Sequence, residues 1–147
     1  MQNAVELNSL DDLNSADTGE MTVVINGRPT DWKWTFAGPG HDKTIELNNR
    51  IARDRLHEDR QIHQAQVNGR KYKAPEESVE EVRARNVDRV VDRLLGWTPI
   101  KIGGQDLQFS PEEARKLLMD PKKINLLAQA LEFLSEEASF MNSSVGS

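Results

Sequence analysis

The sequence contains no cysteine, which excludes a disulfide scaffold and any metal site built from thiolates. It contains no apolar run near the roughly 20 residues that a membrane-spanning helix needs. Its N-terminus also lacks the basic flank and the apolar segment of a secretory signal. We therefore expect a reducing cytoplasm and no membrane partner. The 147 residues, of which 37% are hydrophobic, are enough to build one modest core.

Positive charge is absent from the first 20 residues, which carry five acidic side chains and no lysine or arginine. Taking these five from the 24 acidic residues leaves 19, which equals the number of lysines and arginines. The rest of the chain is therefore balanced and has no strong field for binding nucleic acid. We interpret residues 1–20 as an acidic, flexible segment, with ordering on a partner as the alternative.

Aromatic residues are scarce, at 5%, and three of them alternate within one short stretch. Residues 21–40 read as a β-hairpin, because two β-rich runs flank the Asn-Gly turn pair at Asn26. The second run places Trp32, Trp34 and Phe36 on one face. Such a face is unstable in water, so it covers helices of the same chain or meets another subunit. Both interpretations remain open.

Residues 41–141 are predicted to form a helical domain. A long helix from His41 to Val67 is crowded with charge, and its apolar stripe is interrupted. A helix of this kind bridges solvent or packs by a narrow seam against a neighbouring chain, and we favour the neighbouring chain. A second helix begins at Ser78, carries an aliphatic stripe as far as Leu95 and is predicted to end at Gly96.

A short hairpin is predicted at residues 98–109, because apolar residues alternate on both sides of two adjacent glycines. Ser110 then caps a short helix that ends near Met119. The predicted fold class is α+β and mainly α, a helical bundle with an N-terminal β-hairpin and a second short hairpin between helices.

The last helix is predicted to begin at Pro121, capped by Asp120, and to run to about Met141. Its apolar arc is wide, so it is either the most buried helix or one that also serves a partner. The members of this arc that we assign to partner binding are Leu127, Leu131, Leu134 and Phe140. Residues 142–147 read as a polar tail.

No pattern of catalytic, metal-binding or cofactor-binding residues is present. His57 and His63 are six residues apart, which does not match the i, i+4 spacing of a helical zinc pair. The glycines at 38 and 40 precede a helix, but the lysine and serine or threonine of a phosphate-binding loop are missing. We predict a protein that is not an enzyme and has no cofactor.

The central part of the chain resembles a known family. An aliphatic helix closes on Leu-Leu-Gly-Trp, a Gly-containing hairpin and Phe-Ser-Pro-Glu follow, and a last helix approaches an aromatic residue. This order is similar to the tail assembly chaperones of long-tailed bacteriophages, and it covers residues 78–140. The residues that carry the match are Leu94, Leu95, Gly96, Trp97, Phe109, Ser110, Pro111, Glu112, Leu117, Leu118, Asp120, Leu131, Phe133 and Phe140. The acidic N-terminal segment and the aromatic ribbon depart from a typical member.

The resemblance implies a helical protein of the host bacterial cytoplasm that binds the tape measure protein and assists assembly of the tail tube protein around it. It acts as a monomer or a homo-oligomer. A first alternative is a structural virion protein of the head–tail or tail region, with Trp32, Trp34 and Phe36 packed against neighbouring subunits. A second is a nucleic-acid-binding regulator that uses the basic loop residues Arg70, Lys71 and Lys73.

Overall fold

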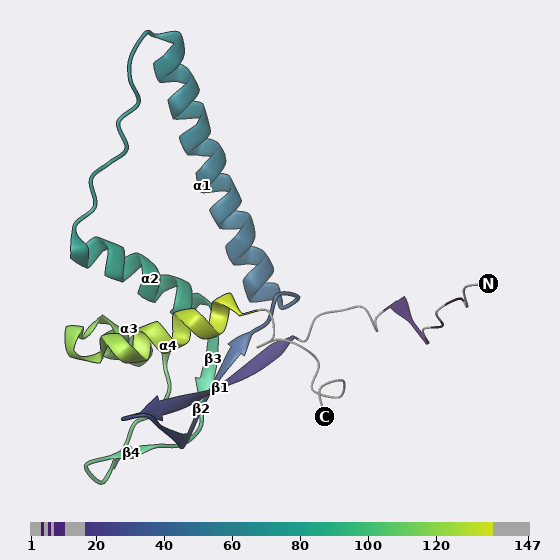
Figure 1. Cartoon of the computed structure of the whole chain (residues 1–147), viewed down its shortest axis with the longest axis vertical. Helices are drawn as coiled ribbons and strands as arrows, with labels where there is room; N and C mark the ends of the chain where they lie inside the picture. The colour runs from purple at the N-terminus through teal and green to yellow at the C-terminus, as the bar shows by residue number, and fades with distance from the viewer. Residues whose placement is uncertain (1–3, 5, 7, 11–16, 137–147) are drawn as a thin grey trace.

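A computed structural model of the chain describes residues 4, 6, 8–10 and 17–136 (Figure 1). The predicted polar tail at 142–147 and most of the acidic N-terminal segment lie outside these residues. The predicted fold class is confirmed, because the described part combines a three-stranded sheet, a two-stranded hairpin and a majority of helix.

The sheet is antiparallel and has the strand order β1-β2-β3, with β1 at Thr18–Ile25, β2 at Arg28–Ala37 and β3 at Leu94–Trp97. The predicted N-terminal hairpin is confirmed. Asn26 and Gly27 have φ angles of 52° and 78°, as a two-residue turn between twisted strands requires. Strand β1 begins at Thr18, three residues before the predicted start at Met21.

Strand β3 corrects the sequence-based prediction for the second helix. Helix α2 spans Val79–Arg93, and the chain leaves it at Leu94 with an extended backbone. The prediction that the helix continues through Leu95 and ends at Gly96 is therefore wrong. The physical reason is tertiary, because Leu94 pairs with Phe36 of β2 and the short strand continues the sheet. This pairing joins the N-terminal hairpin and the helices in one core.

The core lies between the sheet and helices α2, α3 (Pro111–Met119) and α4 (Ile124–Ser135). Trp34 and Phe36 are fully buried at its centre. Ring centroids of Trp34 and Trp97 lie 5.3 Å apart, and those of Phe36 and Phe133 lie 5.5 Å apart. The aromatic ribbon therefore covers helices of its own chain. The other core residues are Met21, Val23, Trp32, Val87, Val90, Val91, Leu94, Ala114, Leu118, Leu127 and Ala130.

The second hairpin is confirmed but is shorter than predicted, with β4 at Lys101–Ile102 and β5 at Gln105–Asp106. The two glycines between these strands have φ angles of 59° and 79°. The indole Nε1 of Trp97 donates to the Leu107 carbonyl at 3.1 Å and holds the hairpin against the core.

The helix starts follow the predicted caps. The Ser78 and Ser110 hydroxyls accept hydrogen bonds from backbone N–H groups three residues ahead. Asp120 caps a short 3₁₀ turn, η2 (Pro121–Lys123), so α4 begins at Ile124 rather than at Pro121.

Helix α4 ends at Ser135, before the predicted end near Met141. Glu136 has an extended backbone there, and the Ser135 hydroxyl donates to the Glu132 carbonyl at 2.8 Å. Such a local side-chain hydrogen bond competes with continuation of the helix.

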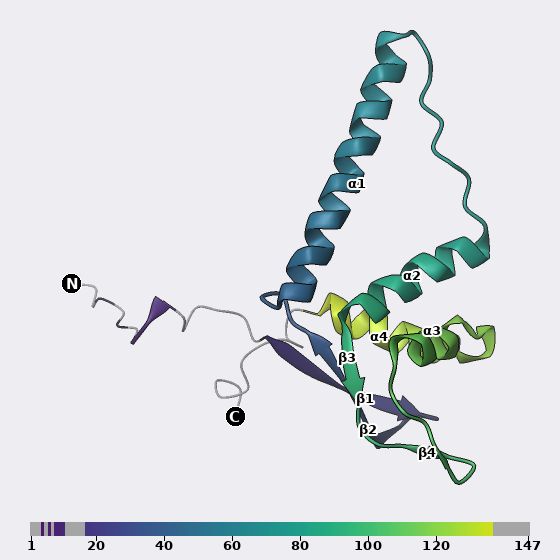
Figure 2. The ribbon, with the colours of Figure 1, turned by 180° about the vertical axis from the view of Figure 1, so that it is seen from behind.

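The predicted long polar helix is confirmed as α1 (Asp42–Val67), which stands apart from this body (Figure 1). Figures 1 and 2 show its first turns beside the sheet and the rest rising away from the other helices. Residues 68–78 form an irregular connection that returns from its far end to the start of α2.

Candidate partner-binding surface

The base of α1 is fixed at the end of β2. The carbonyl oxygen of Ala37 accepts from the Thr44 hydroxyl at 3.3 Å and from Arg93 Nε and Nη2 at 3.1 and 2.8 Å. Partial burial lowers the pKa of the Arg93 guanidinium, which nevertheless stays charged at neutral pH. One backbone oxygen thus joins the start of α1 to the end of α2.

Beyond this base, α1 has little support from the rest of the chain. The helix contains 26 residues, and at 1.5 Å per residue it is about 39 Å long. Only Thr44 and Leu47 are buried, and both lie in its first two turns. A polar helix of this kind is marginal in isolation, so its outer turns present a surface on which a partner can pack.

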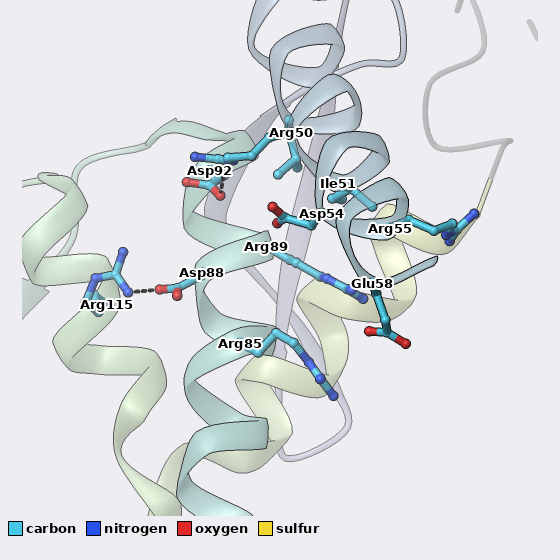
Figure 3. Close-up of a pocket in the computed structure, with 11 residues that line it drawn as sticks. Arg50, Ile51, Asp54, Arg55, Glu58, Arg85, Asp88, Arg89, Asp92 and Arg115 are labelled. Atoms are coloured by element: carbon cyan, nitrogen blue, oxygen red, sulfur yellow. Dashed lines mark hydrogen bonds and ion pairs between the residues drawn. The ribbon is translucent and has the colours of Figure 1, made fainter. Parts of the chain in front are cut away.

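The inner face of α1 borders a hollow of about 740 Å³ (Figure 3). Leu47 and Ile51 provide apolar lining, and charged side chains of both signs surround them. In Figure 3, Arg89 extends from α2 toward α1. The charged residues that line the hollow are Arg50, Asp54, Arg55, Glu58, Arg85, Asp88, Arg89, Asp92 and Arg115.

Two ion pairs involve residues that line the hollow. Arg50 Nη2 of α1 lies 2.8 Å from Asp92 Oδ2 of α2, and Arg115 of α3 pairs with Asp88 of α2. The side chains of the first pair are 50% and 33% exposed, so solvent screens it and it contributes well under about 1 kcal/mol. The hollow has nearly equal numbers of both charges and thus gives no net field for a polyanion.

The outward face of α1 carries a line of exposed apolar side chains. Ile45, Leu56 and Val67 are 47%, 57% and 71% exposed and are spaced by eleven residues. Eleven residues are close to three helical turns, so the three side chains lie in one row along the helix. We call this row the arm stripe. Successive members lie about 16 Å apart, so the stripe offers three separate apolar contacts along one line rather than one continuous patch.

Basic side chains border the middle of the arm stripe. Arg53 lies three residues before Leu56 and Arg60 lies four residues after it, so both are on the same side of the stripe. Both are exposed, and neither forms an ion pair with another residue of the described part. From the sequence, these arginines were interpreted only as part of a helix crowded with charge and were not assigned to a site.

Most of the residues that the sequence assigned to partner binding lie in the core. Trp34 and Phe36 are fully buried, and Trp32 and Leu127 are 8% and 2% exposed. A partner cannot reach these side chains unless the core opens. Leu131 and Leu134 are half-buried against the same core, and Phe140 lies outside the described residues.

The basic loop residues lie in the connection between α1 and α2. Arg70, Lys71 and Lys73 are exposed, whereas Tyr72, which could stack on a base, is partly buried. The structure brings no further part of a nucleic-acid site to this loop in the residues that it describes.

A side chain that the sequence did not predict pairs with one residue on the free edge of the sheet. Gln129 of α4 accepts a hydrogen bond from the Val24 N–H and donates one to the Val24 carbonyl, both at 2.9 Å. Its carboxamide takes the place of a neighbouring strand at this residue of β1. No local signal predicts this contact, because the two residues are 105 positions apart.

Within the described residues, no three histidine, cysteine, aspartate or glutamate side chains gather closely enough to hold a metal ion. None of the described helices combines the length and the apolar content of a membrane span. Comparison of the chain with protein-family models, with curated proteins and with solved structures finds no match.

Proposed function

We propose that this protein is a non-enzymatic phage tail assembly chaperone that binds the tape measure protein and assists assembly of the tail tube. The sequence resemblance over residues 78–140 supports the family. The observation that carries the binding role is α1, a helix of 26 residues of which only Thr44 and Leu47 are buried. A long helix held only at its base offers a surface along which an elongated helical partner packs.

The arm stripe suits a contact that must later be released. Three apolar side chains separated by polar turns bury much less area than a permanent interface does. Small interfaces are typical of transient complexes, so a contact of this size suits a partner that is later released. Tail tube subunits can then replace the chaperone as they assemble around the tape measure protein.

The virion-protein alternative depended on the aromatic ribbon as an assembly surface. Trp32, Trp34 and Phe36 are 8%, 0% and 0% exposed, so the ribbon is already occupied by the protein's own helices. This burial favours the chaperone over the structural protein as the better-supported function.

The experiment that tests the proposal is co-expression with the tape measure protein of the same phage or prophage. We expect the tape measure protein to be insoluble alone and soluble with the wild-type chain. Leu56→Asp should abolish this effect. Ile102→Asp is the matched control, because Ile102 is 55% exposed against 57% for Leu56 but lies on the small hairpin.

Circular dichroism of both variants establishes that the helices are retained. The proposal fails if the wild-type chain leaves the tape measure protein insoluble. It also fails if mass spectrometry of purified virions finds the chain in amounts that match the tail subunits.

A further inference from the structure

The arm stripe has the length of a whole helix–helix contact. Ile45 and Val67 are 22 residues apart, which corresponds to about 33 Å along the helix axis. All three of its side chains are at least 47% exposed. Nothing in the described part of the chain covers this row.

The charges beside Leu56 differ between the two sides of the stripe. Arg53 and Arg60 lie on one side, and Ala52 and Asp59 lie on the other at the corresponding positions. The surroundings of Leu56 therefore carry one positive charge in excess. The arginines are the side chains that an incoming helix meets at its border, since they are exposed and form no ion pair within the described residues.

A second copy of α1 does not match this charge pattern. Each copy brings Arg53, Arg60 and Asp59 to the seam, so two copies bring two positive charges in excess. In a parallel pair Arg60 can meet Asp59 of the other copy, but Arg53 then faces Ala52 and has no acidic partner. An antiparallel pair centred on Leu56 would also place Arg53 of one copy near Arg60 of the other. Like charges at such positions destabilise a helix pair and select against it.

We infer that the arm stripe binds an amphipathic helix of a partner protein whose apolar seam is bordered by acidic side chains. Apolar residues of that helix pack on Ile45, Leu56 and Val67, and its carboxylates pair with Arg53 and Arg60. The inference rests on the proposed function for the identity of the partner, the tape measure protein. The chemistry of the bound segment rests on α1 alone.

The test uses the full-length protein and three synthetic helical peptides of about 28 residues, a length that spans the stripe. The peptides share one leucine seam and carry glutamate, glutamine or lysine at the flanking positions. Fluorescence anisotropy should show that the glutamate peptide binds about tenfold more tightly than the lysine peptide, as expected for two exposed charge contacts changed in sign. Added salt should reduce this difference.

A charge-reversed protein provides the sharper measurement. The double variant Arg53→Glu and Arg60→Glu should prefer the lysine peptide. The control double variant Arg28→Glu and Lys101→Glu has the same net charge but changes exposed residues of β2 and β4, and it should keep the wild-type preference. Leu56→Asp should weaken the binding of all three peptides.

The inference is overturned if the three peptides bind equally or if the double variant keeps the preference for glutamate. It is also overturned if sedimentation shows a dimer of the wild-type chain that Leu56→Asp dissociates, because a second copy then covers the stripe. These outcomes are separate from the solubility assay. If the tape measure protein remains insoluble while the peptide preference holds, the proposed function fails and the inference stands. If the tape measure protein becomes soluble but the peptides bind equally, the inference fails and the proposed function stands.

Discussion

Replacement of Gln129 by alanine tests whether a side-chain amide serves as a strand neighbour in this fold. Strand β1 is at the edge of the sheet, and the Gln129 carboxamide binds both backbone groups of Val24 at 2.9 Å. The substitution removes both hydrogen bonds at once. It leaves an N–H and a C=O on an open sheet edge, which is where strands of other molecules add.

The expected loss of stability follows from the two bonds and from the exposure of Val24. Each neutral hydrogen bond contributes about 0.5–1.5 kcal/mol net, which gives roughly 1–3 kcal/mol for the pair. Val24 is 36% exposed, so water replaces part of this interaction. Alanine also favours the helix slightly more than glutamine does. We therefore expect the free energy of unfolding to fall by about 1 kcal/mol.

Urea unfolding followed by tryptophan fluorescence measures this change, because the three indoles lie in or against the core. Glu132→Ala is the control, since Glu132 is an exposed residue on the same helix. Gln129→Glu should destabilise the protein about as much as Gln129→Ala, because a carboxylate accepts from the Val24 N–H but repels its carbonyl. The reasoning is refuted if Gln129→Ala unfolds at the same urea concentration as the Glu132→Ala control.

Three further changes test other parts of the structure. Trp34→Ala should cost about 3–5 kcal/mol in unfolding free energy, because a fully buried indole is lost; chemical denaturation measures it. Arg50→Ala should cost less than about 1 kcal/mol in the same assay, because its pair with Asp92 is half-exposed. Hydrogen bonds from the Lys123 side chain and the Lys122 N–H lower the pKa of the Asp120 carboxyl. The ionised carboxylate therefore stabilises the folded protein above the unfolded pKa near 4, and this contribution is lost as pH falls through the folded pKa. Asp120→Asn should therefore be less stable than wild type at pH 7, and melting curves at stepwise lower pH should converge.

Local signals in the sequence predicted most of the secondary structure. The Asn-Gly turn at Asn26, the paired glycines at 103 and 104, and the caps at Ser78 and Ser110 each depend on neighbouring residues, and the structure confirms all of them. The long polar helix was likewise predicted over almost its full length. Local chemistry decides these features, so periodicity and turn residues are sufficient to find them.

The errors came from contacts between distant parts of the chain. Leu94 and Leu95 continue a helical pattern in the sequence, yet they form a strand that pairs with β2. Leu94 pairs there with Phe36, which lies 58 residues earlier in the chain. The sequence also could not decide whether the aromatic ribbon packs in the core or forms an assembly surface, because the residues that cover it are far away along the chain. Sequence alternation shows that Trp34 has an apolar side but not which molecule covers it.

The sequence predicted the candidate surface only in part. A narrow seam on the long helix was predicted, but its apolar members were read as one interrupted stripe. In the structure they divide into two faces, with Leu47 and Ile51 toward the hollow and Ile45 and Leu56 toward solvent. Helical spacing alone places the two pairs on opposite faces, but which face turns inward depends on where α2 lies.

The buried residues Thr44 and Leu47 of α1 and its ion pair from Arg50 to Asp92 all lie in the first three turns of the helix, so the length of its outer part is set independently of the core. Adding eleven residues to its outer part would extend the helix by about 16 Å and keep the new side chains nearly in line with the old row. Adding five would rotate the tip by about 140° and break the row. An extended chain covers up to about 3.6 Å per residue, so the return connection would need only about five residues for each such step. Relatives with longer or shorter arms should therefore differ by nearly whole numbers of turns, such as about seven, eleven or eighteen residues, with the sheet and helices α2, α3 and α4 unchanged.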